Sequence, residues 1–348
     1  MMSHRWVKRP PGSNWGEFGA DDRIGRLNLL TPEKVLQGIR EVVAGRSFCL
    51  SLPLDLPGGN VANPRRHPPR LFAAIQDGEC VYNKPMYARP GKPPIAAVCD
   101  DAVLLYTQYS TQWDSFAHAG ALFDADDDGV REVVYYNGWR AGESVVSPKA
   151  NPDAEPWARF EGPNANELGI DNIAVACLQG RAVMVDLHRR FGRKRHAVGY
   201  RDLMRIMAED GVEVEAGDIL CLYTGYDQVI LQMGGNPTRE ALHGTCAGLD
   251  GFDRDLLQWV TDSGLCAIAS DNRAVELSPP ARPPEDDDLV SLHLHCLFKL
   301  GIPLGEQWYL TELATWLREN GRYRFLLTAP PLRLPGAVGS PVTPIATV

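Results

Sequence analysis

The residues with the clearest chemical potential lie in the stretch QYSTQWDSFAHAG, from Gln108 to Gly120. Asp114 and His118 stand four positions apart, so their side chains share one face if the stretch forms a helical turn. A carboxylate beside an imidazole can orient the ring, move protons or bind a metal ion. Gln108 and Gln112 carry amides, where metal chemistry more readily uses imidazole. The stretch therefore predicts a metal-binding catalytic turn, a degenerate one or a polar loop, and its own residues leave the three open.

A second group of candidates lies in DDDLVSLHLHCLFKLGIPLGEQW, residues 286–308. We expect a helix that starts after the three aspartates, on which His293 and His295 point to nearly opposite sides. Only one of the two can therefore face a given site, and the sequence does not say which. Glu306 lies between a glycine and a Gln-Trp pair, where a charged side chain is expected to point into polar surroundings.

An acidic stretch, DADDDGVREVVY, imitates a calcium-binding loop. Asp124, Asp126 and Asp128 occupy alternate positions, and Gly129 occupies the sixth. The twelfth position carries Tyr135, where an EF-hand requires a bidentate glutamate, and a strand pattern continues in place of the exit helix. We interpret this stretch as an acidic surface turn.

The elements that must position these residues indicate an α/β fold. Several apolar runs are continuous, as expected for strands that are covered on both faces. Helical patterns fall between them, each followed by a glycine at its end. Strands are expected over residues 102–107, 181–187, 217–226, 266–271 and 323–330, and helices over 32–44, 200–210, 253–263 and 310–320.

The chain shows no internal repeat and no long linker, so we predict one domain over residues 1–348 with a mixed β-sheet. Residues 1–20, rich in proline and glycine, are expected to form an N-terminal arm. Residues 52–98 are expected to form a long Pro-rich loop region. Its first part, Leu52 to Arg70, is expected to wrap the surface or a neighbouring subunit.

Composition excludes several classes of protein. The 348 residues are 44% hydrophobic, which is ample for a large core, and the formal net charge of -9 argues against a nucleic-acid surface. No apolar run reaches the roughly 20 residues of a membrane span. Eight cysteines without CxxC spacing indicate neither a zinc ribbon nor a redox motif. With no signal-peptide pattern at the N-terminus, we expect a cytoplasmic protein that acts on a small molecule.

At the candidate residues the chain resembles the Putative cyclase family, which includes bacterial kynurenine formamidase and isatin hydrolase. The motif of that family is H-x-G-T-H-x-D-x-P-x-H. Aligned with it, Gln108 and Gln112 fall on the first two histidines, Asp114 on the aspartate and His118 on the last histidine. Thr111 also matches, while serine replaces the glycine and phenylalanine replaces the proline. The TQWD…H form resembles the longer bacterial and fungal branch of the family.

The resemblance extends over nearly the whole chain. NWGEFGADDRIGRLNLLTPE resembles the N-terminal signature of the family, and GRAVMVDL and AGDILCLYTGY resemble its two central strands. HLHCLFKLGIPLGEQWYLTELA resembles its late H…G…E segment and places His293 and Glu306 on the histidine and the glutamate. APPLRLPGAVGSPVTPIA resembles the end of family members. The resemblance implies a barrel-like mixed sheet with surrounding helices, of the swivelling β/β/α type, in a homodimer or homotetramer.

The resemblance also implies a metal site. In metal-dependent members the motif histidines and the aspartate hold a divalent cation, the late histidine and glutamate complete a second or shared position, and the last motif histidine shuttles protons. Carried onto this chain, the metal ligands are Gln108, Gln112, Asp114, His293 and Glu306, and His118 is the general acid and base. Because an amide oxygen is a weaker and harder donor than imidazole, such a set suits Mn²⁺ or Mg²⁺ better than zinc. We expect a divalent ion, Mn²⁺ or Zn²⁺, with a metal-free site as the alternative.

The resemblance therefore implies a hydrolase of a formamide, a cyclic amide or a lactone, in which an activated water attacks the carbonyl. Trp15, Trp113 and Tyr136 are candidates for an apolar pocket wall that suits a substrate with a ring. Two alternatives stay open. One is a metal-free lyase, cyclase or dehydratase in which Asp114 and His118 move protons. The other is a non-catalytic protein that binds a small molecule on the same scaffold.

Overall fold

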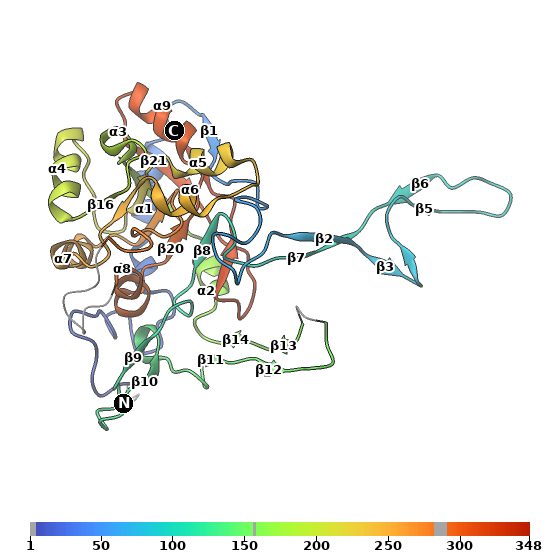
Figure 1. Ribbon diagram of the computed structural model, residues 1–348, viewed down its shortest axis with the longest axis horizontal. Helices are drawn as coiled ribbons and strands as arrows, with labels where there is room; N and C mark the ends of the chain where they lie inside the picture. The colour runs from blue at the N-terminus through green and yellow to red at the C-terminus, as the bar shows by residue number, and fades with distance from the viewer. Residues whose placement is uncertain (1–4, 156–157, 282–290) are drawn as a thin grey trace.

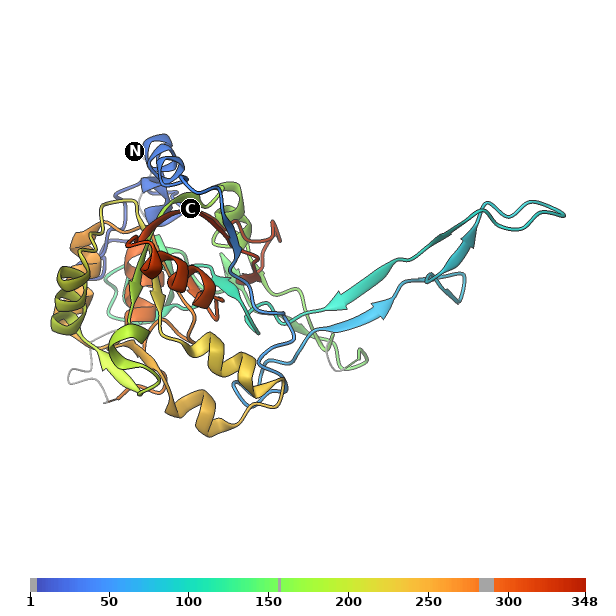
Figure 2. The ribbon, with the colours of Figure 1, turned by 90° about the horizontal axis from the view of Figure 1, so that it is seen from above.

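The structure is a computed structural model, and it describes residues 5–155, 158–281 and 291–348. A nine-stranded sheet forms its centre and curls around the core (Figures 1 and 2). The order of the strands in this sheet is β1-β23-β21-β15-β17-β19-β20-β8-β22. Their bounds are β1 Ser47–Cys49, β8 Gln112–Asp114, β15 Gln179–Asp186, β17 Ile219–Tyr223, β19 Ala267–Ser270, β20 Leu304–Glu306, β21 Arg324–Thr328, β22 Gly339–Pro341 and β23 Ile345–Thr347.

The central strands are buried on both faces, as their continuous apolar sequences predict. In β15, Val183 and Val185 belong to one core cluster, while Ala182 and Met184 belong to the cluster on the opposite face. Strands β15, β17, β19 and β20 run parallel, and β21 and β8 join them antiparallel on either side. The predicted mixed sheet of an α/β fold is therefore confirmed.

Helices cover both faces of this sheet. Buried residues of α4 and α7 pack into the cluster that contains Val183, and those of α2 and α9 pack into the cluster that contains Met184. As predicted, α4 and α7 end at glycines, Gly211 and Gly264, both in the left-handed conformation. The helices are α1 Pro32–Arg40, α2 Ile170–Val175, α3 His188–Phe191, α4 Tyr200–Asp210, α5 Tyr226–Met233, α6 Arg239–Gly244, α7 Arg254–Ser263, α8 Leu292–Leu294 and α9 Thr311–Glu319.

Three expected boundaries differ from the structure. Helix α1 ends at Arg40, before the expected Gly45, and the strand expected to reach Tyr226 ends at Tyr223, because α5 begins at Tyr226. The helix expected near His293 is the short α8, which continues as a π-helical segment, η3, His295–Leu300. Its expected start, residues 286–288, lies outside the described residues. Within the described residues, no helix combines the length and apolarity that a bilayer crossing requires.

Residues 70–104 form a long two-stranded ribbon that extends away from the body, and we call it the ribbon arm (Figures 1 and 2). The expected loop region therefore becomes paired strands from Arg70 onward, because each strand finds an antiparallel partner within the arm. The run that was expected to be a buried strand at 102–107 contributes β7 to this arm, where it is largely exposed. The arm contains β2 Arg70–Ala73, β3 Ile75–Gln76, β4 Glu79–Cys80, β5 Lys84–Met86, β6 Ala96–Val98 and β7 Asp101–Leu104.

The remaining elements are short. The described part of the expected N-terminal arm, residues 5–20, consists of turns and lies against the body through the buried ring of Trp15. Two-residue and three-residue strands pair as β9 with β10, β11 with β14, β12 with β13, and β16 with β18. Their bounds are β9 Ala121–Phe123, β10 Glu132–Val134, β11 Val145–Val146, β12 Lys149–Ala150, β13 Phe160–Glu161, β14 Asn164–Ala165, β16 His196–Val198 and β18 Ala247–Leu249, and the 3₁₀ helices are η1 Gly25–Leu29 and η2 Tyr136–Gly138.

Candidate metal and catalytic site

Two strands of the large sheet supply the first part of the site. The stretch expected as a helical turn contains strand β8, Gln112–Asp114, and His118 lies in the turn that follows it. Because side chains alternate along a strand, Gln112 and Asp114 share one face, while Trp113 points into the core. Glu306 of β20 lies directly opposite Gln112, and cross-strand partners share a face. The two strands therefore bring an amide and two carboxylates to one surface.

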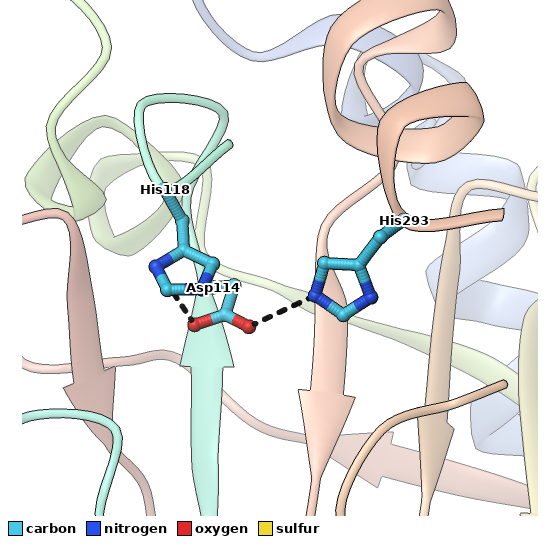
Figure 3. Close-up of side chains that lie close together, drawn as sticks. All are labelled: Asp114, His118 and His293. Atoms are coloured by element: carbon cyan, nitrogen blue, oxygen red, sulfur yellow. Dashed lines mark ion pairs between the residues drawn. The ribbon is translucent and has the colours of Figure 1, made fainter. Parts of the chain in front are cut away.

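His293 reaches the same surface from α8. Its Nε2 lies 3.7 Å from Asp114 Oδ2 and 3.6 Å from Glu306 Oε1. His118 approaches from the other side, with Nδ1 3.8 Å from Asp114 Oδ1. Figure 3 shows the carboxylate of Asp114 between the two imidazole rings. The candidate ligand atoms of Asp114, His118 and His293 all lie within 4.8 Å of one another.

Glu276 also belongs to the site, although no pattern in the sequence points to it. Its Oε2 lies 3.0 Å from His293 Nδ1, and its Oε1 accepts a hydrogen bond from the backbone N–H of His293 at 3.2 Å. Because an ionised carboxylate can only accept, Nδ1 of this imidazole carries a proton, and Nε2 is the nitrogen that points to Asp114 and Glu306, where a cation would replace its proton. His295 points elsewhere: its Nε2 lies 2.9 Å from Thr261 Oγ1, and burial lowers its pKa to about 3. The histidine that faces the site is His293.

Burial and mutual proximity set the charges of these groups. Burial raises the pKa of Asp114, but the nearby imidazoles of His118 and His293 outweigh this effect and hold the pKa below its usual value. Burial, together with the neighbouring Asp114 carboxylate, raises the pKa of Glu306 to about 8. Burial lowers the pKa of His118, although Asp114 opposes this shift. Burial also acts to lower the pKa of His293, but Glu276 and Asp114 raise it well above the usual value.

The residues present fit a divalent cation. Asp114 Oδ2 is buried and has no hydrogen-bond partner within the described residues. A buried carboxylate oxygen normally has a hydrogen-bond or ionic partner, and a bound cation would supply that partner for Asp114. Imidazole nitrogens and carboxylate oxygens are ligands that Zn²⁺ and Mn²⁺ use. His293, backed by Glu276, has the carboxylate–imidazole arrangement that orients metal-binding histidines.

The two glutamines of the motif take different positions. The amide orientation of Gln112 that satisfies its surroundings has its NH₂ group donating to backbone carbonyls, the nearer being Gln108 O at 2.6 Å. This orientation turns Gln112 Oε1 toward Asp114 Oδ1. Gln108 instead presents nitrogen, because its Nε2 lies 3.5 Å from His118 Nδ1. The expected ligand role therefore fits Gln112, whereas Gln108 contacts the predicted acid–base residue.

A cavity of 320 Å³ opens beside this cluster. Arg66 stands at its wall and donates from Nη1 to Gln108 O at 2.7 Å. The guanidinium of Arg66 also lowers the pKa of Asp114 and of His118, although its effect is smaller than that of burial and of the charges within the cluster. Like Glu276, Arg66 carried no signal in the sequence, since it lies in a Pro/Arg-rich segment. Residues that line the cavity include Asn63, Arg66, Gln108, Tyr109, His118, Phe252, Arg273, Glu276, His293, Glu306 and Gln307.

The aromatic residues expected at the pocket wall lie in the core instead. Trp15, Trp113 and Tyr136 are at most 1% exposed, and none of them lines the cavity. Each polar atom of these rings has a hydrogen-bond partner in the protein: backbone carbonyls for the two tryptophans and Asp22 for the tyrosine. Burying such rings contributes strongly to stability, and the alternation of β8 turns Trp113 away from Asp114. The expectation of an aromatic pocket wall made by these three is therefore wrong.

The acidic stretch forms an exposed turn between β9 and β10. The carboxylate of Asp124 accepts hydrogen bonds from the backbone N–H groups of Asp128 and Gly129, each at 3.1 Å. Asp126 forms an ion pair with Arg140 at 3.1 Å. This geometry agrees with the prediction of an acidic surface turn.

Known proteins resemble this chain in sequence pattern and in fold. A model of the family described as Putative cyclase matches residues 50–277. The structure of a protein described as a novel cyclase superposes with a TM-score of 0.72 at 28% identity, covering 98% of this chain and 100% of that one. No curated protein matches the chain.

Two isatin hydrolase structures share the fold at 13% identity, each with a TM-score of 0.52. One is isatin hydrolase A from Labrenzia aggregata bound to benzyl benzoate, with 90% of this chain and 97% of that chain covered. The other is an isatin hydrolase bound to the product analogue thioisatinate, with 91% and 99% covered. At this identity the likeness shows the curled α/β fold alone.

Proposed function

Since the chain belongs to the Putative cyclase family, we propose that it is a hydrolase of a small cyclic or aromatic amide, a formamide or a lactone. One observation carries the proposal. The ligand atoms of Asp114, His118 and His293 lie within 4.8 Å of one another beside a 320 Å³ cavity, around an Asp114 oxygen without a hydrogen-bond partner in the described chain. Relatives of the fold that are named isatin hydrolase support a cyclic amide as the first substrate to test.

We infer that the site takes a divalent cation, Mn²⁺ or Zn²⁺. Asp114 and His293 would hold it, with Gln112 Oε1 and Glu306 beside them. A divalent cation in such a site polarises a carbonyl and lowers the pKa of a bound water. Glu276 keeps the His293 ring in one orientation, so that Nε2 stays directed at the carboxylates.

His118 is the residue suited to move the proton. Of the two imidazoles it is the more exposed, and among the described residues no carboxylate lies within hydrogen-bond distance to fix its ring as Glu276 fixes His293. Burial lowers its pKa, so the ring is neutral near pH 7 and can accept a proton. As the imidazolium forms, the nearby Asp114 carboxylate stabilises its charge. The same ring then returns the proton to the leaving nitrogen or oxygen of the substrate.

A second candidate function is a metal-free lyase, cyclase or dehydratase, and one observation favours it. Glu306, whose pKa is raised to about 8, and His118, whose pKa is lowered, face one cavity. Two titratable groups whose environments move their pKa values in opposite directions suit an acid and a base. In this case Glu306 would supply the proton and His118 would remove one.

Metal analysis separates the two functions. The purified protein is analysed for bound metal, treated with a chelator, and assayed after addition of Mn²⁺ or Zn²⁺ with isatin, N-formylkynurenine and a small lactone. We expect bound metal, loss of hydrolysis after chelation and recovery with one of the two ions. Metal-free protein whose activity is insensitive to chelators would overturn the metallohydrolase and support the lyase. Absence of any turnover, with ligand binding unchanged in His118→Ala, would instead support a binding protein.

A further inference from the structure

The cavity wall carries two arginines that are neither metal ligands nor acid–base groups in the proposed function. Arg66 lies in the segment that leads to the ribbon arm, and Arg273 lies in the loop that follows β19. Both are partly buried, and neither forms an ion pair with a carboxylate among the described residues. Because a partly buried charge is costly without an opposite charge, such arginines are typical of a site that binds an anion.

Arg66 keeps most of its hydrogen-bond donors available. A guanidinium has five N–H donors, and Arg66 uses Nη1 to donate to Gln108 O at 2.7 Å. Within the described part of the chain, the edge formed by its Nε and Nη2 has no partner. Two parallel N–H groups on one edge match the two oxygens of a carboxylate, so Arg66 can bind a carboxylate through two hydrogen bonds.

Arg273 holds in place the segment that carries Arg66. Its Nη1 donates to Ala62 O, four residues before Arg66, and its Nε is buried without a hydrogen-bond partner in the described residues. Arg273 also lies three residues before Glu276, which accepts a hydrogen bond from Nδ1 of His293. One loop therefore connects the Arg66 segment to the histidine that would hold the cation.

Arg66 lies close enough to the catalytic cluster for one small molecule to contact both. Its charge influences the pKa of Asp114, of His118 and of Glu306. The cavity volume of 320 Å³ is near the lower end of the range for ligand pockets, about 300–1,000 Å³, which suits a compact molecule. A single negative charge fits this cavity better than a phosphate dianion, because the carboxylates of the cluster repel a second charge.

We propose that Arg66 binds a carboxylate of the substrate, so that the substrate is a small amide, formamide or lactone with a carboxylate apart from the bond that is hydrolysed. Arg273 positions the Arg66 segment and adds positive charge to the same wall. This substrate class rests on the proposed function, whereas binding of the carboxylate requires no turnover. The two are therefore tested separately.

Binding is tested with benzoate and benzamide, two ring compounds of nearly the same shape that differ in charge. Isothermal titration calorimetry measures the Kd of each at mildly alkaline pH, where the His118 ring is neutral because burial lowers its pKa. The variant is Arg66→Gln. Arg65→Gln is the matched control, since Arg65 is the exposed neighbour and is not among the residues that line the cavity. Circular dichroism verifies that both variants are folded.

We expect wild type to bind benzoate more tightly than benzamide. Arg66→Gln should weaken benzoate binding by about 10-fold to 100-fold, as expected for the loss of hydrogen bonds between charged groups, and leave benzamide binding unchanged. The control should bind both compounds as wild type does. Three results would overturn the proposal: no preference for benzoate in wild type, an equal loss in the control, or benzoate binding that Arg66→Gln leaves intact.

Turnover tests the substrate class with 2-formamidobenzoate and formanilide, which contain the same formamide bond and differ in one carboxylate. We expect a higher kcat/KM for 2-formamidobenzoate in wild type, by about 10-fold or more, and loss of this preference in Arg66→Gln. Equal values in wild type, or a preference that the variant keeps, would overturn the substrate class. If neither compound is hydrolysed while benzoate binding depends on Arg66, the proposed hydrolase is wrong and the carboxylate site stands.

Discussion

Replacing Glu276 with glutamine should weaken metal binding while the fold stays intact. Glu276 accepts hydrogen bonds from His293 Nδ1 at 3.0 Å and from the His293 backbone N–H at 3.2 Å. Glutamine has nearly the same shape, and its single carbonyl oxygen can still accept from Nδ1. The variant therefore removes the charge and one of the two hydrogen bonds, but keeps a partner for the ring.

The expected size of the effect follows from these contacts. A hydrogen bond to a charged acceptor contributes about 1.5–3 kcal/mol, against about 0.5–1.5 kcal/mol for a neutral one. The exchange at Nδ1 therefore costs roughly 1–2 kcal/mol, or about 5-fold to 30-fold in Kd. The lost bond to the backbone N–H adds to this cost. The total falls within the about 10-fold to 100-fold loss that is typical when the partner of a metal-binding histidine is removed.

Competition with a chromogenic chelator measures the Kd for Zn²⁺ in wild type and Glu276→Gln. The comparison is made at alkaline pH, because Glu276 also raises the pKa of His293 and protons compete least there. Asp202→Asn is the matched control: Asp202 Oδ2 lies 2.9 Å from His196 Nε2, in a pair outside the cavity. A Kd for Glu276→Gln within a factor of about two of the wild-type value would refute the reasoning. So would an equal loss in the control.

Three further predictions follow. His118→Ala should lower kcat by about 10²-fold to 10⁴-fold in steady-state kinetics, while elemental analysis should find the metal content unchanged. Loss of the metal as well would show that His118 is a ligand. Arg66→Gln removes a positive charge that lowers the pKa of His118, so the pKa of His118 should rise in this variant. The acidic limb of the pH–rate profile should then move to higher pH. A limb at the same pH as in wild type would contradict the assignment of His118 as the base. Trp113→Ala removes a ring that is 0% exposed, so it should lower the free energy of unfolding by about 3–5 kcal/mol, measured by urea denaturation. A loss below about 1 kcal/mol, which is typical of a surface residue, would show that the ring is not part of the core.

The central sheet could be predicted from the sequence because burial on both faces leaves a continuous apolar run. The run over residues 181–187 became β15, that over 266–271 contains β19, and that over 323–330 contains β21. Strand β8 was not predicted, since only the middle residue of Gln112–Asp114 is apolar and the strand is three residues long. The apolar run before it, residues 102–107, predicts a buried strand, but it supplies the exposed β7 of the ribbon arm. Apolar pattern alone does not distinguish a core strand from a strand of a projecting arm.

The sequence named candidate residues that do lie close together, but it predicted a different local geometry for them. Asp114 and His118 do come together, but through a strand and the turn after it, not through a helical face. Glu276 was missed because it lies 17 positions before His293, and only the packing of the loop after β19 against α8 brings the two together. A partner of this kind leaves no local pattern, since its spacing is set by tertiary structure.

The two glutamines of the motif look equivalent in the sequence, four positions apart, and the fold gives them different chemistry. Gln112 lies on β8 opposite Glu306, so its oxygen joins a surface that already holds two carboxylates and the Nε2 of His293. One imidazole among several oxygens is a harder donor set than a site built on histidines, and harder sets favour Mn²⁺ over Zn²⁺. Gln108 precedes the strand and contacts His118, so its amide acts on the proton carrier. The identity of the metal should therefore depend on Gln112, and the basicity of His118 on Gln108.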